Sequence, residues 1–504
     1  MKYIVLGTNQ EHKIGLTSNT AYLIEDQWDD WFKYSTMYDL WVVNENKEKV
    51  WIGKVKIGQV DMKSDQRRPD IRNTFNQLGE VFFSLGQDDY YYERIKELGD
   101  DLRDEILNNL NDMAKNEKIF DKYIGLNVTQ NSLLRGISTK TVIEQFRRIA
   151  KGGARLTSYS FRYQAAISKE LDIKSMELSF DIKPKSNPPT NIQVLIGRNG
   201  VGKTHLINNM INSIVNSIEN EEYGSFTSEE DSTDIFSKVV FVSFSAFDEE
   251  LNIEKKKMPY IKIGLPEKIN QETLVNFFTE NILECLRGMK KELLIKTLQI
   301  LQSDPIFNES GIVELCSESR FSSEAEKEDF KNQSKKIFKR FSSGHKIIIL
   351  TVATLIQTVE EKTLVFLDEP EAHLHPPLLA SFVRALSELL MERNGVAIIV
   401  THSPVILQEV PKKCVWKMRR TGKVAIAERL KMESFGENIA SLTAEVFGLE
   451  VTHSGYHNLL EEAVRKYGDY DTIINKFEGQ LGMEARAILK VLIAVENEKE
   501  HNQE

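Results

Sequence analysis

A chain of 504 residues that is 41% hydrophobic and 28% charged has the composition of a globular protein, and it is too long for a single hydrophobic core. Its net charge of −10 argues against nucleic-acid binding over the whole surface, although local basic segments remain compatible with it. Because no apolar run approaches the ~20 residues of a membrane helix, no signal peptide is visible and the three cysteines are scattered, we expect a cytoplasmic protein without a membrane domain, disulfides or a zinc ribbon.

The N-terminal part of the chain is expected to form a separate α+β region. Strands are predicted at residues 3–7, 40–43 and 50–57, and residues 92–115 have the spacing of one amphipathic helix. Four of the five tryptophans lie in the first 51 residues, together with Phe32, Tyr34 and Tyr38. They form either an aromatic-rich core, which we favour, or a platform on which bases stack.

A basic segment follows at residues 135–169, with few acidic residues between its arginines and lysines. It is either a solvated linker, the interpretation we favour, or a contact for nucleic acid. After it, residues 176–182 and 192–196 are predicted as strands that a proline-rich turn separates.

A glycine-rich motif of the form G-x-x-x-x-G-K-T comes directly after the strand at 192–196 and leads into a predicted helix at 205–217. This strand–turn–helix context is the one in which the motif binds nucleoside triphosphates. Glycines let backbone N–H groups surround phosphate oxygens, Lys203 can reach the β- and γ-phosphates, and the Thr204 hydroxyl can bind Mg²⁺. The predicted ATP-binding residues of the motif are Gly197, Arg198, Asn199, Gly200, Val201, Gly202, Lys203 and Thr204.

The rest of the chain alternates between helical and strand patterns. A buried strand is predicted at 239–244, a compact helical insertion with segments at 272–302 and 324–341 lacks a sustained heptad, and a mainly helical tail covers 437–504. Between them, helices at 347–358 and 378–392 alternate with strands at 363–367 and 396–400, which is typical of a parallel sheet covered by helices. The expected regions are 1–165 (accessory), 166–247 (first α/β lobe), 248–340 (helical insertion), 341–450 (second α/β lobe) and 451–504 (helical).

Two acids, Asp368 and Glu369, end the apolar strand at 363–367. Because ligands bind at the carboxyl ends of strands in open α/β sheets, we expect both acids near the phosphates. Asp368 would hold Mg²⁺ through water, and Glu369 would polarise the attacking water.

Two further polar groups follow predicted element ends. Ser342 and Gly344 open the helix at 347–358 and are either a simple N-cap or a second helix end that faces phosphate. His402 follows the strand at 396–400 and is either structural or a sensor of the γ-phosphate.

Taken in order, these motifs resemble the ABC-type ATPase family, in its soluble branch with chromosome-maintenance and RecF-like members, over residues 170–245 and 340–450. The resemblance implies an α/β P-loop ATPase head and a head-to-head dimer in which Ser342 and Gly344 of the partner subunit close over the ATP. It also implies catalytic roles for Lys203, Glu369 and His402, the last as a switch histidine. Residues 371–376 resemble the loop through which two sites communicate, and we disfavour metal binding by its His373 and His375.

Two departures from the family pattern suggest slow hydrolysis. His345 stands where the signature often has Gln or Glu, and residues 243–248 contain no counterpart of the family's glutamine-bearing loop. A single ATPase unit without membrane segments disfavours transporters, the insertion has no coiled coil of the double-strand-break repair type, and the tail has no acidic cluster that would build a Toprim nuclease.

The tail block at residues 435–456 resembles the PtuA-type ATPase of Septu and retron anti-phage systems. This resemblance implies an ATP-hydrolysing scaffold that forms the head-to-head dimer or a larger homo-oligomer and regulates a separate HNH nuclease of the PtuB type. In retron versions, a reverse transcriptase and its RNA–DNA product would bind as well. The alternatives are an SMC/RecF-like ATPase that acts directly on DNA in repair or recombination, and an ATP sensor that hardly hydrolyses.

Overall fold

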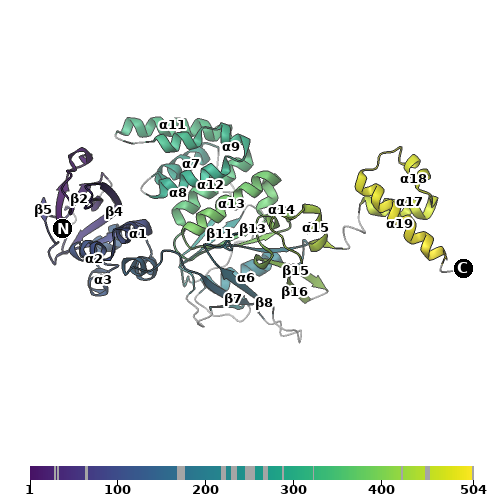
Figure 1. The fold of residues 1–504 in the computed structure, drawn as a ribbon, viewed down its shortest axis with the longest axis horizontal. Helices are drawn as coiled ribbons and strands as arrows, with labels where there is room; N and C mark the ends of the chain where they lie inside the picture. Colours follow the sequence, from purple (N-terminus) through teal and green to yellow (C-terminus); the bar gives the residue numbers. More distant parts are fainter. Residues whose placement is uncertain are drawn as a thin grey trace.

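The computed structural model comprises an N-terminal unit, a central α/β unit with a helical insertion, and a small C-terminal helical unit (Figure 1). The structure describes residues 1–27, 30, 33–62, 66–166, 176–216, 223–228, 235–243, 256–264, 271–286, 289–319, 321, 323–421, 424–448 and 455–501.

The N-terminal unit is built on a six-stranded sheet in the order β5-β1-β2-β3-β4-β6. Only β1 and β2 pair in parallel, and the other neighbours are antiparallel. The strand bounds are β1 (Lys2–Leu6), β2 (Thr20–Glu25), β3 (Met37–Val43), β4 (Lys49–Gln59), β5 (Thr74–Phe75) and β6 (Phe82–Gly86). The three predicted strands are therefore present, while β2, β5 and β6 had not been predicted.

The prediction of one continuous helix at 92–115 is wrong. The chain forms α1 (Asp89–Glu97) and α2 (Asp100–Asn109), because Gly99 between them has φ +99° and breaks the helical path. Helix α3 (Glu117–Tyr123) and the short helices η2 (Thr129–Leu133), α4 (Thr139–Thr141), η3 (Val142–Phe146) and α5 (Arg147–Ala150) complete the unit.

The aromatic residues near the N-terminus support the core interpretation where the structure describes them. Tyr34 and Tyr38 are 2% and 1% exposed, and Tyr38 belongs to the central strand β3. Trp51 donates its indole N–H to Asp39 and packs under the Arg94 guanidinium. Trp28, Trp31 and Phe32 lie outside the described residues.

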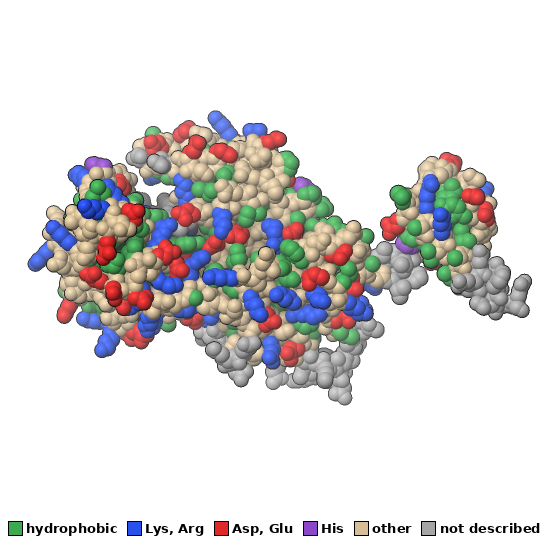
Figure 2. Space-filling model, in the orientation of Figure 1, with side chains coloured by type: hydrophobic (Ala, Val, Ile, Leu, Met, Phe, Trp, Pro, Cys, Tyr) green, Lys and Arg blue, Asp and Glu red, His purple; other side chains and the backbone are tan. Residues whose placement is uncertain are grey.

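The linker interpretation of residues 135–169 is wrong for its described part, which is ordered and joins the N-terminal unit to the central unit. Arg148 pairs with the buried Glu361 at 2.5 Å, and Arg155 pairs with Asp89 at 3.1 Å and with Glu392 at 2.8 Å. The arginines thus act as interface cations. On the face shown in Figure 2, basic and acidic side chains are interspersed over the N-terminal unit.

The central unit contains a seven-stranded sheet in the order β12-β11-β13-β14-β9-β15-β16, parallel except for the edge strand β16. The predicted parallel sheet is confirmed, but the first strand in this order, β12, and the last two, β15 and β16, had not been predicted. The strands are β9 (Ile192–Gly197), β11 (Lys238–Ser243), β12 (Tyr260–Gly264), β13 (Thr363–Asp368), β14 (Val396–Thr401), β15 (Val415–Thr421) and β16 (Val424–Arg429). Every residue of β9, β13 and β14 is buried, as expected for parallel strands covered on both faces.

The two faces of this sheet are covered differently. On one face, α6 (Lys203–Val215) packs between the large sheet and a three-stranded antiparallel sheet of β7 (Tyr159–Gln164), β8 (Glu177–Ile182) and β10 (Ser225–Ser228). On the other face, α12 (Ser343–Thr358) and α13 (Pro376–Glu392) share one core with the insertion.

The helices of the insertion form a compact layer on α12 and α13, as predicted, and not a coiled-coil arm (Figure 1). The predicted helical region 248–340 is wrong in one part, because it includes β12, which pairs with β11 at the edge of the large sheet. Its helices are α7 (Gln271–Cys285), α8 (Met289–Leu301), α9 (Pro305–Glu309), α10 (Ile312–Glu318) and α11 (Glu324–Arg340). The segment predicted as helical at 272–302 is therefore two helices.

The other α-helices lie after β14 in the chain. They are α14 (Pro404–Leu407), α15 (Ile439–Phe447) and, in the C-terminal unit with a small core of its own, α17 (Tyr456–Tyr467), α18 (Tyr470–Lys476) and α19 (Met483–His501). Among the helices that the structure describes, none combines the length and apolar character needed to cross a bilayer.

Glu392 at the end of α13 connects three parts of the chain, and its removal should destabilise the fold. Burial would raise its pKa, but hydrogen bonds from Lys296, Tyr90 and Arg155 outweigh burial and lower that pKa to about 2. Compared with the ordinary value of 4.5, this favours the folded state by about 3 kcal/mol at pH 7. We expect Glu392→Gln to lose up to about that much free energy of unfolding in urea titrations.

The pH dependence follows from the lowered pKa. The stabilisation is complete above pH 4.5 and is lost as the pH falls toward 2, so the wild type and Glu392→Gln should converge in acid. Glu388→Gln is the matched control, because Glu388 lies on the same helix and is joined to Lys296 but has no bond to Tyr90 or Arg155. An equal loss in both variants would contradict a role for Glu392 in joining the units.

Candidate nucleotide-binding site

The glycine-rich loop connects the carboxyl end of β9 to the N-terminus of α6. Gly200 and Gly202 have φ of +79° and +96°, and a Cβ at either would meet no atom within 4 Å, so backbone conformation selects glycine there. Gly197 is needed for a different reason. A Cβ on it would lie 2.5 Å from the Met418 carbonyl oxygen of β15. A loop in which left-handed glycines lie on either side of one ordinary residue, as at Gly200 and Gly202, presents successive N–H groups to an anion.

Lys203 is folded back over this loop. Its Nζ donates to the carbonyl oxygens of Gly197 and Arg198, each at 3.0 Å, and lies 3.8 Å from Glu369 Oε1. Burial lowers the pKa of Lys203, while the charge of Glu369 and two further carboxylates opposes that effect. Thr204 is exposed in the first turn of α6. A buried cation beside the loop, an exposed hydroxyl and a loop of N–H groups fit a triphosphate and its Mg²⁺.

The two acids after β13 occupy the same edge of the sheet. Asp368 is the last residue of the strand, is 5% exposed and pairs in register with Val400 of β14. Glu369 has φ 44° and ψ 58°, a left-handed conformation that is costly for a residue with a Cβ, and its N–H donates to the Val400 carbonyl at 2.9 Å. This turn directs Oε1 toward Lys203 and to within 3.5 Å of His402 Nδ1.

His402 is held by an acid whose role the sequence had not revealed. Glu371 Oε1 accepts hydrogen bonds from the Thr401 hydroxyl at 2.6 Å and from the His402 backbone N–H at 2.7 Å, and it lies 3.1 Å from His402 Nδ1. Glu371 had been assigned only to the communication loop. Its side chain is 8% exposed, so it is a buried anchor for the end of β14. In the sequence, this role could have been suggested only by the presence of a second acid, Glu371, two residues after Glu369.

Ser342 and Gly344 begin α12, as predicted, but no hydrogen bond or ion pair of the described residues joins them to the phosphate loop of the same chain. Gly344 is required by close packing, because a Cβ there would lie 2.7 Å from the His373 carbonyl oxygen of η5 (Pro370–His373). The structure thus brings Lys203, Glu369 and His402 together and leaves the start of α12 outside that group.

The residues 243–248, where a glutamine-bearing loop was sought, are described only at Ser243, which pairs in register with Asp368 at the end of β11. The other residues of this segment lie outside the described residues.

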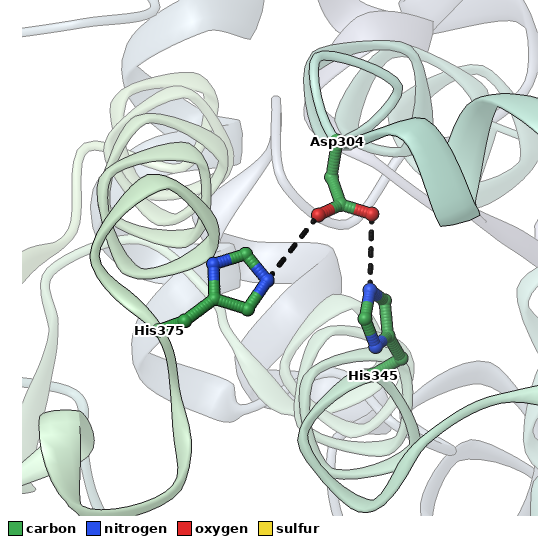
Figure 3. A group of neighbouring side chains, drawn as sticks. All are labelled: Asp304, His345 and His375. Carbon is green, nitrogen blue, oxygen red and sulfur yellow. Dashed lines mark hydrogen bonds and ion pairs between the residues drawn. The ribbon is translucent and has the colours of Figure 1, made fainter.

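His345 and His375 meet at one carboxylate, although no cluster had been predicted (Figure 3). His345 Nε2 is 3.0 Å from Asp304 Oδ1, and His375 Nε2 is 3.6 Å from Asp304 Oδ2. Asp304 and His345 are buried, while the side chain of His375 is 53% exposed. Asp304 comes from the insertion, and its position in front of α12 could not be read from the sequence.

Comparison with known proteins adds two observations. Residues 312–408 match the family model described as "AAA domain, putative AbiEii toxin, Type IV TA system", a span that includes α12, β13 and His402. The chain is also similar to MJ1267, an ATP-binding cassette of an ABC transporter in its ADP conformation, at 14% identity over 59% of this chain and 100% of that chain, with a TM-score of 0.30. A further similar structure is cbiO1 from Clostridium perfringens, part of the ABC transporter complex cbiONQ, at 14% identity over 62% and 96% of the two chains, with a TM-score of 0.27.

The match to the AAA domain model thus falls on the part of the central unit that contains α12, β13, α13 and β14 of the parallel-sheet region. Over the full length, the chain is 37% identical to protein ea59 of Escherichia phage lambda across 501 residues, which cover 94% of this chain and 95% of that protein. Identity at this level over nearly the whole of both proteins shows that the chain belongs to the same family as protein ea59 of phage lambda.

Proposed function

We propose that this protein binds ATP with Mg²⁺ in the glycine-rich loop and hydrolyses it in a head-to-head dimer. One observation carries the proposal: Lys203, Glu369 and His402 converge from three different strand ends, β9, β13 and β14, at one edge of the parallel sheet. Polar groups that gather at strand carboxyl ends in front of a phosphate loop are what triphosphate chemistry requires.

Each side chain has a distinct part in this reaction. Lys203 now donates to loop carbonyls and would transfer those hydrogen bonds to phosphate oxygens. Glu369 is 38% exposed and would accept a proton from the attacking water. His402, oriented by Glu371, would donate to the γ-phosphate. When bound by Thr204 and Asp368, Mg²⁺ would offset the charge of the phosphates.

The start of α12 supports the proposed dimer, because Ser342 does not cap this helix. Ser342 is exposed and its side chain makes no N-cap hydrogen bond, so the first-turn N–H groups of this 16-residue helix have no side-chain partner from Ser342. Because this helix end makes no bond to the loop of its own chain, we propose that it completes the site of a second copy.

We further propose that ATP controls a separate partner, a nuclease of the HNH type, in defence against phages. The tail block at 435–456 supports this idea, and the family model's description as a toxin of a toxin–antitoxin system is compatible with it. The C-terminal unit offers a surface for a protein partner, since Leu459, Met483 and Val491 are 55%, 91% and 62% exposed. A reverse transcriptase with its RNA–DNA product would be a further partner in a retron setting.

The alternative, direct action on DNA in repair or recombination, has less support. In the basic segment that suggested a DNA contact, Arg148 pairs with Glu361 of the central unit, and Arg155 pairs with Glu392 of the central unit and with Asp89 of the N-terminal unit. Those charges are therefore not available to phosphates of a nucleic acid.

We predict that Glu369→Gln retains ATP binding, loses turnover by about 100-fold or more and accumulates as an ATP-bound dimer, because it removes the base and leaves the phosphate loop intact. Light scattering after gel filtration with Mg-ATP measures the dimer, and phosphate release measures turnover. Lys203→Ala is the control that should neither bind ATP nor dimerise. A Glu369→Gln protein that stays monomeric in saturating ATP would contradict the proposed sandwich.

Glu371→Gln should lower turnover by about 10- to 100-fold with little change in ATP affinity, because His402 would lose its charged anchor. Fluorescent ATP titration and steady-state kinetics separate the two quantities. Glu388→Gln makes the same glutamate-to-glutamine substitution on α13, away from His402, and controls for the loss of one negative charge. An unchanged turnover would mean that His402 needs no orientation by Glu371.

The purified protein is expected to leave DNA intact and to co-purify with an HNH nuclease encoded beside it. Co-expression with the flanking genes and mass determination of the complex test the partner. DNA cleavage by this chain alone, lost in Glu369→Gln, would instead favour direct action on DNA.

A further inference from the structure

The hydroxyl of Ser342 is engaged in an unusual way for a residue that begins a helix. A serine at this place ordinarily accepts hydrogen bonds from the N–H groups of the first turn. Here Ser342 Oγ lies 2.6 Å from His345 Nδ1 and makes no cap hydrogen bond. The Ser342 hydroxyl is therefore engaged by the imidazole and does not cap the N–H groups of the first turn.

His345 is itself held from the opposite side. Its Nε2 is 3.0 Å from Asp304 Oδ1, the same oxygen that accepts the backbone N–H groups of Ile306 and Phe307 at 2.9 and 3.2 Å. The rings of Phe307 and Phe341 lie 5.2 and 6.0 Å from the imidazole and close the pocket around it. Burial would raise the pKa of Asp304, but its hydrogen bonds outweigh burial and keep that pKa low, so the carboxylate is an anion.

One arrangement of protons with neutral imidazoles satisfies these contacts. If His345 carries its proton on Nε2, it donates to Asp304, and Nδ1 accepts the Ser342 hydroxyl. His375 Nδ1 likewise accepts the Leu378 N–H at 3.4 Å, which leaves its Nε2–H toward Asp304 Oδ2. A metal ion bound by the three side chains would need both Nε2 atoms without protons and would remove these bonds. The cluster is better explained as a hydrogen-bond relay.

We propose that Asp304 and His345 are positioning residues that present Ser342 to the γ-phosphate of a nucleotide bound by a second copy of this chain. This inference rests on the proposed function. When a phosphate oxygen accepts the Ser342 hydroxyl, that hydroxyl no longer donates to Nδ1. His345 keeps its bond to Oγ by taking one proton from solvent onto Nδ1, and the Asp304 carboxylate stabilises the imidazolium. Closure of the dimer around ATP is thus coupled to the uptake of one proton for each α12 helix, which is two protons for each dimer.

The charge environment of His345 is simple enough to test this coupling. The titratable groups that face it are Asp304 from the start of α9 and His375 from the turn before α13, and its other neighbours are the apolar rings of Phe307 and Phe341. Lys346, the next residue on α12, lies over the Phe338 ring. Asp304 is therefore the only anion that the described contacts place on His345.

The test compares variants in the full chain with Glu369→Gln as the parent, so that ATP-bound dimers accumulate. Asp304→Asn removes the negative charge but keeps an amide oxygen that can accept hydrogen bonds from the backbone N–H groups of Ile306 and Phe307 and from His345 Nε2. The N-cap of α9 is therefore retained. His345→Gln replaces the imidazole by a neutral amide. Glu309→Gln, an exposed acid on the same helix α9, is the matched control. Sedimentation in Mg-ATP gives the dimer dissociation constant, and fluorescent ATP titration gives monomer affinity.

We expect the dimer dissociation constant of the parent to rise by up to about 100-fold for each pH unit as the solution is made more alkaline, because the two sites of a dimer take up one proton each. Asp304→Asn should weaken the dimer about tenfold or more at neutral pH, and His345→Gln should abolish the pH dependence, with monomer ATP affinity unchanged in both. Glu309→Gln should follow the parent. Thermal unfolding of each variant checks that the fold is retained.

Other outcomes would overturn the proposal. Equal dimerisation of the parent, Asp304→Asn and His345→Gln across the pH range would contradict the relay while leaving the proposed function intact. Stoichiometric binding of Co²⁺ that is lost in His375→Ala would show a metal site instead. A parent that never dimerises with ATP would contradict the proposed function itself, which is a distinguishable result.

Discussion

The candidate site depends on the register of three parallel strands, β9, β13 and β14. Pairing of Ile196 with Thr401 and of Val400 with Asp368 aligns the carboxyl ends of these strands at one edge. Lys203, Glu369 and His402 each follow one of those ends within a few residues, so hydrogen bonds of the backbone fix where their side chains meet. A shift of one residue in either pairing would reverse the facing of the strand's side chains and separate the group.

This dependence explains which parts of the site could be predicted. Lys203 and Glu369 are recognisable because a short local pattern sets their surroundings, a glycine-rich turn in one case and an apolar strand before two acids in the other. Glu371 and Asp304 act through contacts 31 and 41 residues away along the chain. Nothing in the residues next to Asp304 indicates that it lies against His345, since that contact arises only when the insertion packs on α12.

The fold shows the same division. Alternating helices and buried strands predicted the parallel sheet, because burial on both faces leaves a continuous apolar run. The hairpin of β15 and β16 was missed, since an edge with one exposed face carries charged residues such as Arg419 and Glu428, which pair at 3.2 Å. Likewise, the arginines at 135–162 were misinterpreted because their partners, Asp89, Glu361 and Glu392, are scattered over the sequence.

The backbone of Glu369 has a consequence for how the protein balances robustness against activity. A non-glycine residue in the left-handed region costs about 1 kcal/mol or more, and here it is the residue that must face the phosphate. Glycine at this position would relax the turn and remove the carboxylate together. A substitution that relieves the backbone strain would therefore stabilise the fold and remove the carboxylate at the same time. Selection for thermal stability alone would favour the replacement of Glu369.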